Sequence, residues 1–216
     1  MLSESIEYLG VLIDKHMTLE GQINRVVSSS YYELKKIKSI RKYLSIDDTA
    51  QLIHAFISSK LDYCNALYLG LPSYLITKLQ RVQNAAMRVL LKLNKYVPVA
   101  HHLFQQHWLP IERRIVFKNL TIVFKCIHAL APIPLMQCIT LRDDYRTSFT
   151  LKRTFYPKNM LDHRAFAVFA PILWNNLPLN LRSNTVISSF KSSLKTFLFS
   201  EFFDYKQRVN MIIKII

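Results

Sequence analysis

Residues 47–93 read DDTAQLIHAFISSKLDYCNALYLGLPSYLITKLQRVQNAAMRVLLKL, and the spacing of their apolar side chains decides the fold. Apolar residues recur at every third or fourth position, which is the spacing of one buried face of an α-helix. Gly70 suits the left-handed position just beyond a helix end, and Pro72 can begin a helix but cannot continue one. The stretch therefore predicts two long antiparallel helices joined by a sharp turn at residues 70–72.

The first of these helices is expected to begin at Ser45, with Asp48 three residues later forming a capping box. Its buried face is expected to contain Ala50, Ile53, Ile57, Leu61, Cys64 and Leu67. We expect Leu61 and Cys64 to face Ala86 of the second helix across the turn. The core of the bundle would then depend on this contact and on the turn itself.

The second helix separates an apolar face from a basic face. The apolar stripe contains Leu75, Leu79, Val82, Ala86, Val89 and Leu93. At 100° per residue, a second stripe about 110° away contains Lys78, Arg81, Arg88 and Lys92. A flat cationic helix face suits a polyanion such as a phosphate backbone, and the ordinary alternative is a solvated face.

A third helix is predicted over residues 18–43, before the other two. Its apolar face contains Ile23, Val26, Ser30, Leu34 and Ile37. Its basic face contains Lys35, Lys38 and Lys42, and Lys36 and Arg41 raise the local positive charge further. Because the connections are short, the three helices are expected to form an antiparallel bundle. Residues 8–14 predict a short strand that has no sheet to join and is therefore poorly anchored.

The C-terminal half is expected to form a second group of packed helices. A connector over residues 95–110 places Trp108 in the core, and Pro110 begins a helix that ends near Ala129. This helix is apolar except along a wet stripe of Arg114, Lys118, Thr121 and Lys125. Residues 140–160 have the composition of a long mobile loop, and two further helices are expected over residues 163–176 and 186–203.

The predicted fold class is thus mainly α, with a short strand or hairpin remnant at the N-terminus. The expected organisation is a remnant over residues 1–17, the three-helix bundle over 18–94, the C-terminal helical region over 95–203 and an unassigned tail over 204–216.

The chain is strongly basic, with 29 Lys and Arg against 14 Asp and Glu and a net charge of +15. Such an excess favours nucleic acid or an anionic membrane as partner. A membrane is the weaker choice, because charged residues interrupt the most apolar segment, residues 111–139. Residues 1–17 have no signal-peptide pattern, and three cysteines in apolar surroundings suggest reduced core residues of an intracellular protein.

Several motifs resemble those of the reverse transcriptases of LINE-type retrotransposons, of the jockey and chicken-repeat kind. The most extensive are SKLDYCNAL at residues 59–67, GLP at 70–72 and LQRVQNAAMR at 79–88. Shorter ones are YLGV at 8–11, HWLPI at 107–111, FK at 117–118, AP at 131–132, RAF at 164–166, WNNLP at 174–178 and SFKSSLK at 189–195. They follow the family's order from residue 8 to about residue 199. The resemblance implies the end of a polymerase palm, a thumb and a C-terminal region.

Catalytic chemistry is not expected from this chain by itself. A polymerase needs carboxylates that converge on two metal ions. Asp47 and Asp48 belong to the first turn of a helix, where acids are favoured. Asp143 and Asp144 lie in the predicted loop without a strand on either side. No Cys or His spacing predicts zinc, and neither a nucleophile motif nor a phosphate-binding loop is present, so no metal or cofactor is expected.

Two functions from different classes follow from these observations. The first is a catalytically empty part of an RNA-directed DNA polymerase that binds an RNA–DNA or DNA template–primer duplex. The residues expected to bind nucleic acid are Lys78, Arg81, Arg88, Lys92, Lys35, Lys38 and Lys42. The alternative is a helical scaffold that binds protein and uses its charge for solubility. Salt-dependent duplex binding separates the two.

Overall fold

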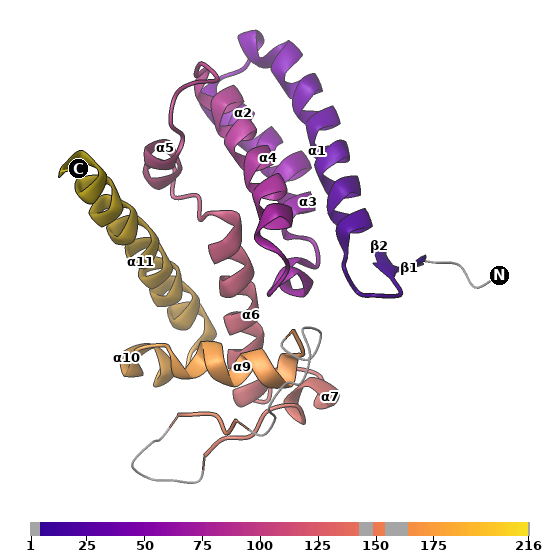
Figure 1. The fold of residues 1–216 in the computed structure, drawn as a ribbon, viewed down its shortest axis with the longest axis vertical. Coiled ribbons are helices and arrows are strands. Elements are labelled where there is room, and N and C mark those ends of the chain that lie inside the picture. The colour runs from indigo at the N-terminus through magenta and orange to yellow at the C-terminus, as the bar shows by residue number, and fades with distance from the viewer. Residues whose placement is uncertain (1–4, 143–148, 154–163, 216) are drawn as a thin grey trace. The chain divides into compact units, whose positions relative to one another are not determined.

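The computed structural model describes residues 5–142, 149–153 and 164–215, and for residues 204–215 only the backbone. The described residues are mainly helical, with a short two-stranded antiparallel sheet at the N-terminus, which confirms the predicted fold class (Figure 1). The chain divides into two compact units, residues 1–114 and 115–216. Residues 95–110, grouped above with the C-terminal region, lie in the first unit.

The N-terminal segment is a hairpin, which is one of the two forms expected there, and residues 8–14 are therefore not one continuous strand. Strands β1 (Ser5–Tyr8) and β2 (Val11–Asp14) pair antiparallel with Tyr8 opposite Val11. The chain reverses at Leu9 and Gly10, whose φ angles of 47° and 74° are those of a two-residue hairpin turn. The position of this turn could not be predicted, because leucine gives no signal for a positive φ.

The hairpin is also better attached than expected. The Tyr63 hydroxyl donates a hydrogen bond to the Leu9 carbonyl at 2.6 Å. The Leu12 amide donates to Gln22 Oε1 at 3.0 Å, and Val11 is buried. These contacts attach the hairpin to the helical bundle, so the expectation of a poorly anchored end is wrong.

Asp14 connects the hairpin to the first helix. Its carboxylate accepts hydrogen bonds from the backbone amides of His16, Thr18 and Leu19, and from the Thr18 hydroxyl. Burial would raise the pKa of Asp14, but these donors outweigh it and lower the pKa from 3.8 to about 2. The ionised carboxylate therefore holds the turn that leads into the helix.

Three helical segments form the bundle of the first unit (Figure 1). They are α1 (Glu20–Ile40) with the 3-10 turn η1 (Arg41–Tyr43), then α2 (Ile46–Ile53) continued by η2 (His54–Ser58) and α3 (Ser59–Asp62), and finally α4 (Ser73–Leu91). All five apolar-face positions predicted for α1 are buried. The chain runs up, down and up, so α1 and α4 are parallel to each other. Lys78 near the start of α4 accordingly meets Glu20, and Arg41 meets Leu90 near its end.

The second segment begins as predicted and ends early. Ser45 Oγ accepts from the Asp48 amide at 3.0 Å, which is the expected cap. The helix then passes through the π-helical turn η2 and stops at Asp62, because Tyr63 is extended and Cys64 is left-handed with φ 51°. A 3-10 turn, η3 (Asn65–Tyr68), replaces the helix that was expected to reach Gly70.

This early stop corrects part of the predicted core. Leu61 and Ala86 are buried as expected, with 2% and 1% of their surface exposed. Cys64 is only half-buried and Leu67 is 44% exposed, so neither belongs to the buried face. Tyr68, at 1% exposed, fills that part of the core instead.

The turn and apolar face of α4 follow the prediction closely. Gly70 has φ 73°, and Pro72 is the residue that precedes the helix. Four predicted positions are buried, namely Leu75, Leu79, Val82 and Ala86. Val89 and Leu93 are only half-buried, and Met87 and Leu90 complete the buried face.

Residues 95–114 pack against the bundle. They contain a short helix that was not predicted, α5 (Ala100–Gln105), and the start of α6 (Ile111–Ile127). Trp108 is 7% exposed and its ring lies 5.0 Å from that of His54, which confirms it as a core residue. Gln83 Nε2 donates to the Leu109 carbonyl at 2.8 Å, and Arg114 forms an ion pair with Asp62.

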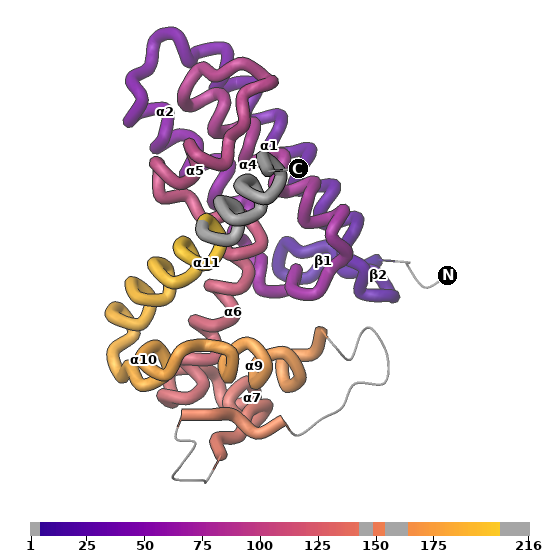
Figure 2. The backbone as a smooth tube through the Cα atoms, turned by 60° about the vertical axis from the view of Figure 1, so that its left-hand side comes forward, coloured from indigo at the N-terminus to yellow at the C-terminus, as the bar shows by residue number. Residues whose placement is uncertain are grey.

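The second unit continues α6 and adds α7 (Ile133–Met136), α9 (Phe166–Asn175), α10 (Leu179–Arg182) and α11 (Ile187–Ile215), whose path can be followed in Figure 2. Its aromatic core joins three helices, because Phe190 stacks on Phe124 at 4.5 Å and lies 5.7 Å from Trp174. Two helices were expected here at about these places, and His163 lies outside the described residues. The short α7 and α10 were not predicted.

The described residues of the predicted mobile loop at residues 140–160 are held by specific contacts. Leu141 and Leu151 form an antiparallel bridge, and the Asn175 side chain exchanges two hydrogen bonds of 2.9 Å with the Leu151 backbone. Residues 143–148 and 154–160 lie outside the described part.

Thr121 of α6 is buried, so it does not belong to the solvent-exposed stripe predicted for this helix. Of the three free cysteines only Cys126 is buried, and Cys138 is exposed.

In the described part of the chain, no helix is both long enough and apolar enough to cross a membrane.

Candidate nucleic-acid interface

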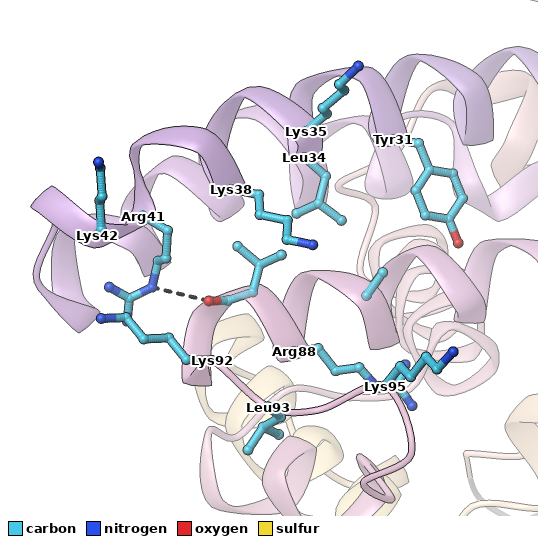
Figure 3. A pocket seen from close by; sticks show the side chains of 12 residues that line it. Tyr31, Leu34, Lys35, Lys38, Arg41, Lys42, Arg88, Lys92, Leu93 and Lys95 are labelled. Carbon is cyan, nitrogen blue, oxygen red and sulfur yellow. Dashed lines mark hydrogen bonds between the residues drawn. The ribbon is translucent and has the colours of Figure 1, made fainter.

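A groove runs between the C-terminal halves of α1 and α4, and we call it the basic groove (Figure 3). Its cavity volume is about 780 Å³. It is lined by Tyr31, Leu34, Lys35, Lys38, Arg41, Lys42, Ala85, Arg88, Val89, Lys92, Leu93 and Lys95. All twelve residues belong to the first unit.

Helical periodicity and the parallel packing of α1 and α4 together create this groove. The lining residues of each helix are spaced by three or four, so each set forms one stripe. Because the helices run in the same direction, the stripe at the end of α1 lies opposite the stripe at the end of α4. Lys92 is left-handed with φ 53° and ends α4, and the following chain places Lys95 beside the groove.

The groove has an excess of positive charge without internal compensation. Seven of its lining residues are basic and none is acidic. Within the described residues, none of these seven forms an ion pair, whereas Lys78, Lys60 and Arg114 elsewhere in the unit each pair with a carboxylate. Unpaired cations on two facing helices attract a polyanion.

Arg41 is a structural member of the groove. It is 7% exposed, and its Nη2 donates to the Leu90 carbonyl at 2.7 Å. Its Nε donates to the Val89 carbonyl at 3.1 Å (Figure 3), and its Nη1 donates to Leu44 at 2.8 Å. The Val89 and Leu90 carbonyls lie at the end of α4, where a helix leaves acceptors unsatisfied and favours a cation. Arg41 therefore joins α1 to α4 and is not free to bind a ligand.

Arg88 is also partly engaged, because it donates to the Val97 carbonyl at 3.3 Å and is half-buried. The five lysines of the groove are all exposed, namely Lys35, Lys38, Lys42, Lys92 and Lys95. Two of them lie over the ring of the next residue, Lys42 at 4.6 Å from Tyr43 and Lys95 at 4.8 Å from Tyr96. Such contacts leave the positive charge in place, so the five lysines are available to anions.

The structure gathers most of the sequence-predicted binding residues in this groove. Lys35, Lys38, Lys42, Arg88 and Lys92 line it. In Figure 3 the Lys38 side chain turns toward α4, whereas those of Lys35 and Lys42 extend from the outer side of α1.

Two predicted binding residues lie elsewhere. Lys78 is near the opposite end of α4, where it forms an ion pair with Glu20 at 3.3 Å and donates to Asn24 at 2.9 Å. Arg81 is exposed and does not line the groove. Conversely, Tyr31 and Lys95 line the groove and were not singled out from the sequence, because neither belongs to a predicted basic stripe.

The described residues contain no other site with evident chemistry. They hold no group of three or more His, Cys, Asp or Glu side chains that could bind a metal ion. Asp48 is bonded to Ser45 at the start of α2, as expected for an acid in a first helical turn. Asp143 and Asp144 lie outside the described part of the chain.

Comparisons with models of known protein families, with curated proteins and with solved structures found no match.

Proposed function

We propose that this chain binds a nucleic-acid duplex through the basic groove, as the thumb-like part of a LINE-type reverse transcriptase would bind a template–primer. The observation that carries the proposal is the set of five exposed lysines along and just beyond the ends of two parallel helices, with no acidic residue among the groove's lining. The motif resemblance supports the choice of a template–primer as the duplex, and the groove itself supports a polyanion.

The dimensions of the groove agree with contact to a phosphate backbone. From Tyr31 to Lys42, α1 and the turn η1 that continues it rise about 17 Å at about 1.5 Å per residue. One strand of B-DNA presents a phosphate about every 3.4 Å, so this length matches about five phosphates. Lysine side chains bind phosphates as point charges, so the contact reads charge and shape with little preference for base sequence.

We propose further that this chain supplies binding and not the polymerase reaction. Phosphoryl transfer by two metal ions needs converging carboxylates. Two acidic residues of the first unit have structural partners, because Asp62 pairs with Arg114 and Asp48 accepts a hydrogen bond from the Ser45 hydroxyl. In this proposal the catalytic aspartates belong to the palm of the parent polymerase.

The test compares two variants that lose the same charge. The groove variant replaces Lys35, Lys38, Lys42 and Lys92 with glutamine, which preserves helix propensity. Arg41 and Arg88 are left in place because they bond to the backbone. The control variant replaces four exposed lysines outside the groove with glutamine, namely Lys15, Lys36, Lys118 and Lys191.

Affinity for an RNA–DNA hybrid duplex is measured by fluorescence anisotropy over a series of salt concentrations. Each lost phosphate contact lowers the slope of log affinity against log salt by about 0.9, so the groove variant is expected to lose about 3.6 from the slope. The control variant is expected to keep most of its salt dependence. If the two variants bind equally well at every salt concentration, the groove is only a solvated face and the protein-binding scaffold becomes the better account.

A further inference from the structure

We infer that the floor of the basic groove holds a nucleobase of an unpaired strand, with Tyr31 as its stacking partner. This inference rests on the proposed function and names the part of the nucleic acid that the groove recognises. Phosphates would contact the lysines at the rim, and one base would enter between α1 and α4. The expected ligand is therefore a single-stranded segment, such as the overhang of a template–primer junction.

The floor of the groove is apolar, which duplex phosphates alone do not explain. It is formed by Tyr31, Leu34, Ala85, Val89 and Leu93, all of which line the cavity. Ala85 is small and leaves room above α4, and Leu34 is a buried part of the floor with 5% of its surface exposed. The phosphates of an intact duplex carry its charge on the outside, so they would meet the lysines and leave this apolar floor unfilled.

Tyr31 is placed to stack on a flat ring. Its side chain is 41% exposed and reaches from α1 toward α4 in Figure 3. It lies about 10 Å along α1 from Lys38, at 1.5 Å per residue. The cavity of about 780 Å³ falls in the size range of small-ligand sites, which are lined mainly by apolar and aromatic side chains with a few polar groups.

Two further exposed tyrosines adjoin lysines of the groove. Tyr43 is 77% exposed beside Lys42, and Tyr96 is 79% exposed beside Lys95. Aromatic rings interleaved with cations are the arrangement by which proteins bind single-stranded nucleic acid, because bases stack on the rings while phosphates meet the charges. This arrangement favours an unpaired strand over an acidic peptide, which would use the charges but not the rings.

The experiment uses two oligonucleotides of the same length and charge. One is an intact single strand, and the other is a strand of abasic sites, which keeps the phosphates and lacks the bases. Both are titrated with the full chain at one salt concentration by fluorescence anisotropy. The parent protein is expected to bind the intact strand more tightly than the abasic strand.

Three variants locate the stacking contact. Tyr31→Ala is expected to weaken binding of the intact strand by about 5- to 150-fold, the range measured for loss of one stacked base, and to leave abasic binding unchanged. Tyr31→Phe keeps the ring and is expected to bind as the parent does. Tyr32→Ala is the matched control, because Tyr32 is the next residue, is 62% exposed and does not line the groove. Melting curves check that every variant is folded.

The inference is overturned if the parent binds intact and abasic strands equally. It is also overturned if Tyr31→Ala weakens both strands by the same factor, or no more than Tyr32→Ala does. The proposed function can survive either result, because it fails only if the groove and control lysine variants bind the duplex alike. The two failures are therefore distinguishable.

Discussion

The loss of Arg41 should destabilise the first unit more than the loss of any exposed cation beside it. Arg41 is 7% exposed and contacts three carbonyl oxygens, those of Leu44, Val89 and Leu90. Hydrogen bonds that involve a charged group contribute about 1.5–3 kcal/mol each. These contributions are not additive, and carbonyls at the end of α4 recover some bonding to water. We therefore expect Arg41→Met to lower the free energy of unfolding by about 3 kcal/mol.

Arg41→Lys should recover only a minor part of this loss. A lysine ammonium is a point charge, whereas the guanidinium is a planar fork that reaches several acceptors at once. The matched control is Lys42→Met, since Lys42 is the next residue, is exposed and forms no hydrogen bond to α4. A change at such a surface site should stay within about 0.5 kcal/mol.

Urea unfolding provides the measurement. The chain has two tryptophans, so a Trp174→Phe background leaves Trp108 as the reporter of the first unit. With an m value of about 2 kcal/mol/M, a loss of 3 kcal/mol moves the midpoint down by about 1.5 M. An unchanged midpoint in both Arg41 variants would refute the reasoning that this residue holds α1 against α4.

Three other predictions concern the hairpin, the core and catalysis. Asp14 has a pKa of about 2 in the folded chain, below its ordinary 3.8, so its stabilising effect is present above pH 4 and is lost as pH falls toward 2. The melting temperature of Asp14→Asn should therefore depend less on pH across this range, and a pH dependence equal to that of the parent would contradict the assignment. Leu61→Asp should unfold the bundle, because an unpaired charge in the core costs several kcal/mol. Leu67→Asp should melt nearly as the parent does, since Leu67 is 44% exposed, and equal melting of the two variants would mean that the helix faces are wrong. The isolated chain should not extend a primer with magnesium or manganese, and template-dependent incorporation that survives substitution of Asp143 and Asp144 would oppose that prediction.

The helix faces of the bundle could be predicted because periodicity and turn residues agree there. Gly70 occupies the left-handed position that its sequence context suggested, and Ser45 caps the following helix. The early end of α3 could not be predicted, because a cysteine in the left-handed region leaves no local signal. The π-helical turn before it is likewise set by packing and not by residue type.

Each basic stripe of the candidate site could be predicted from the sequence, but the groove that the two stripes form together could not. Periodicity identified the lysines of α1 and the cations of α4 separately. Which ends of the two stripes meet depends on the parallel packing of α1 and α4. This packing places Lys78 beside Glu20, whereas Arg88 and Lys92 lie in the groove near the other end of α4. In the sequence, Arg41 cannot be distinguished from the other basic residues between residues 35 and 42. Its role depends on carbonyl groups 48 and 49 residues away in the sequence.

Lysine footprinting tests the central claim most directly, because it needs no substitution. The full chain is acetylated briefly with and without a saturating RNA–DNA hybrid duplex, and the rate at each lysine is measured by mass spectrometry. If nucleic acid binds the basic groove, acetylation in the complex should be slower at its five exposed lysines, namely Lys35, Lys38, Lys42, Lys92 and Lys95. Exposed lysines outside the groove, such as Lys15 and Lys36, should react at the same rate in both samples. Protection that is uniform along the chain, or concentrated at lysines outside the groove, would contradict the claim that nucleic acid binds there.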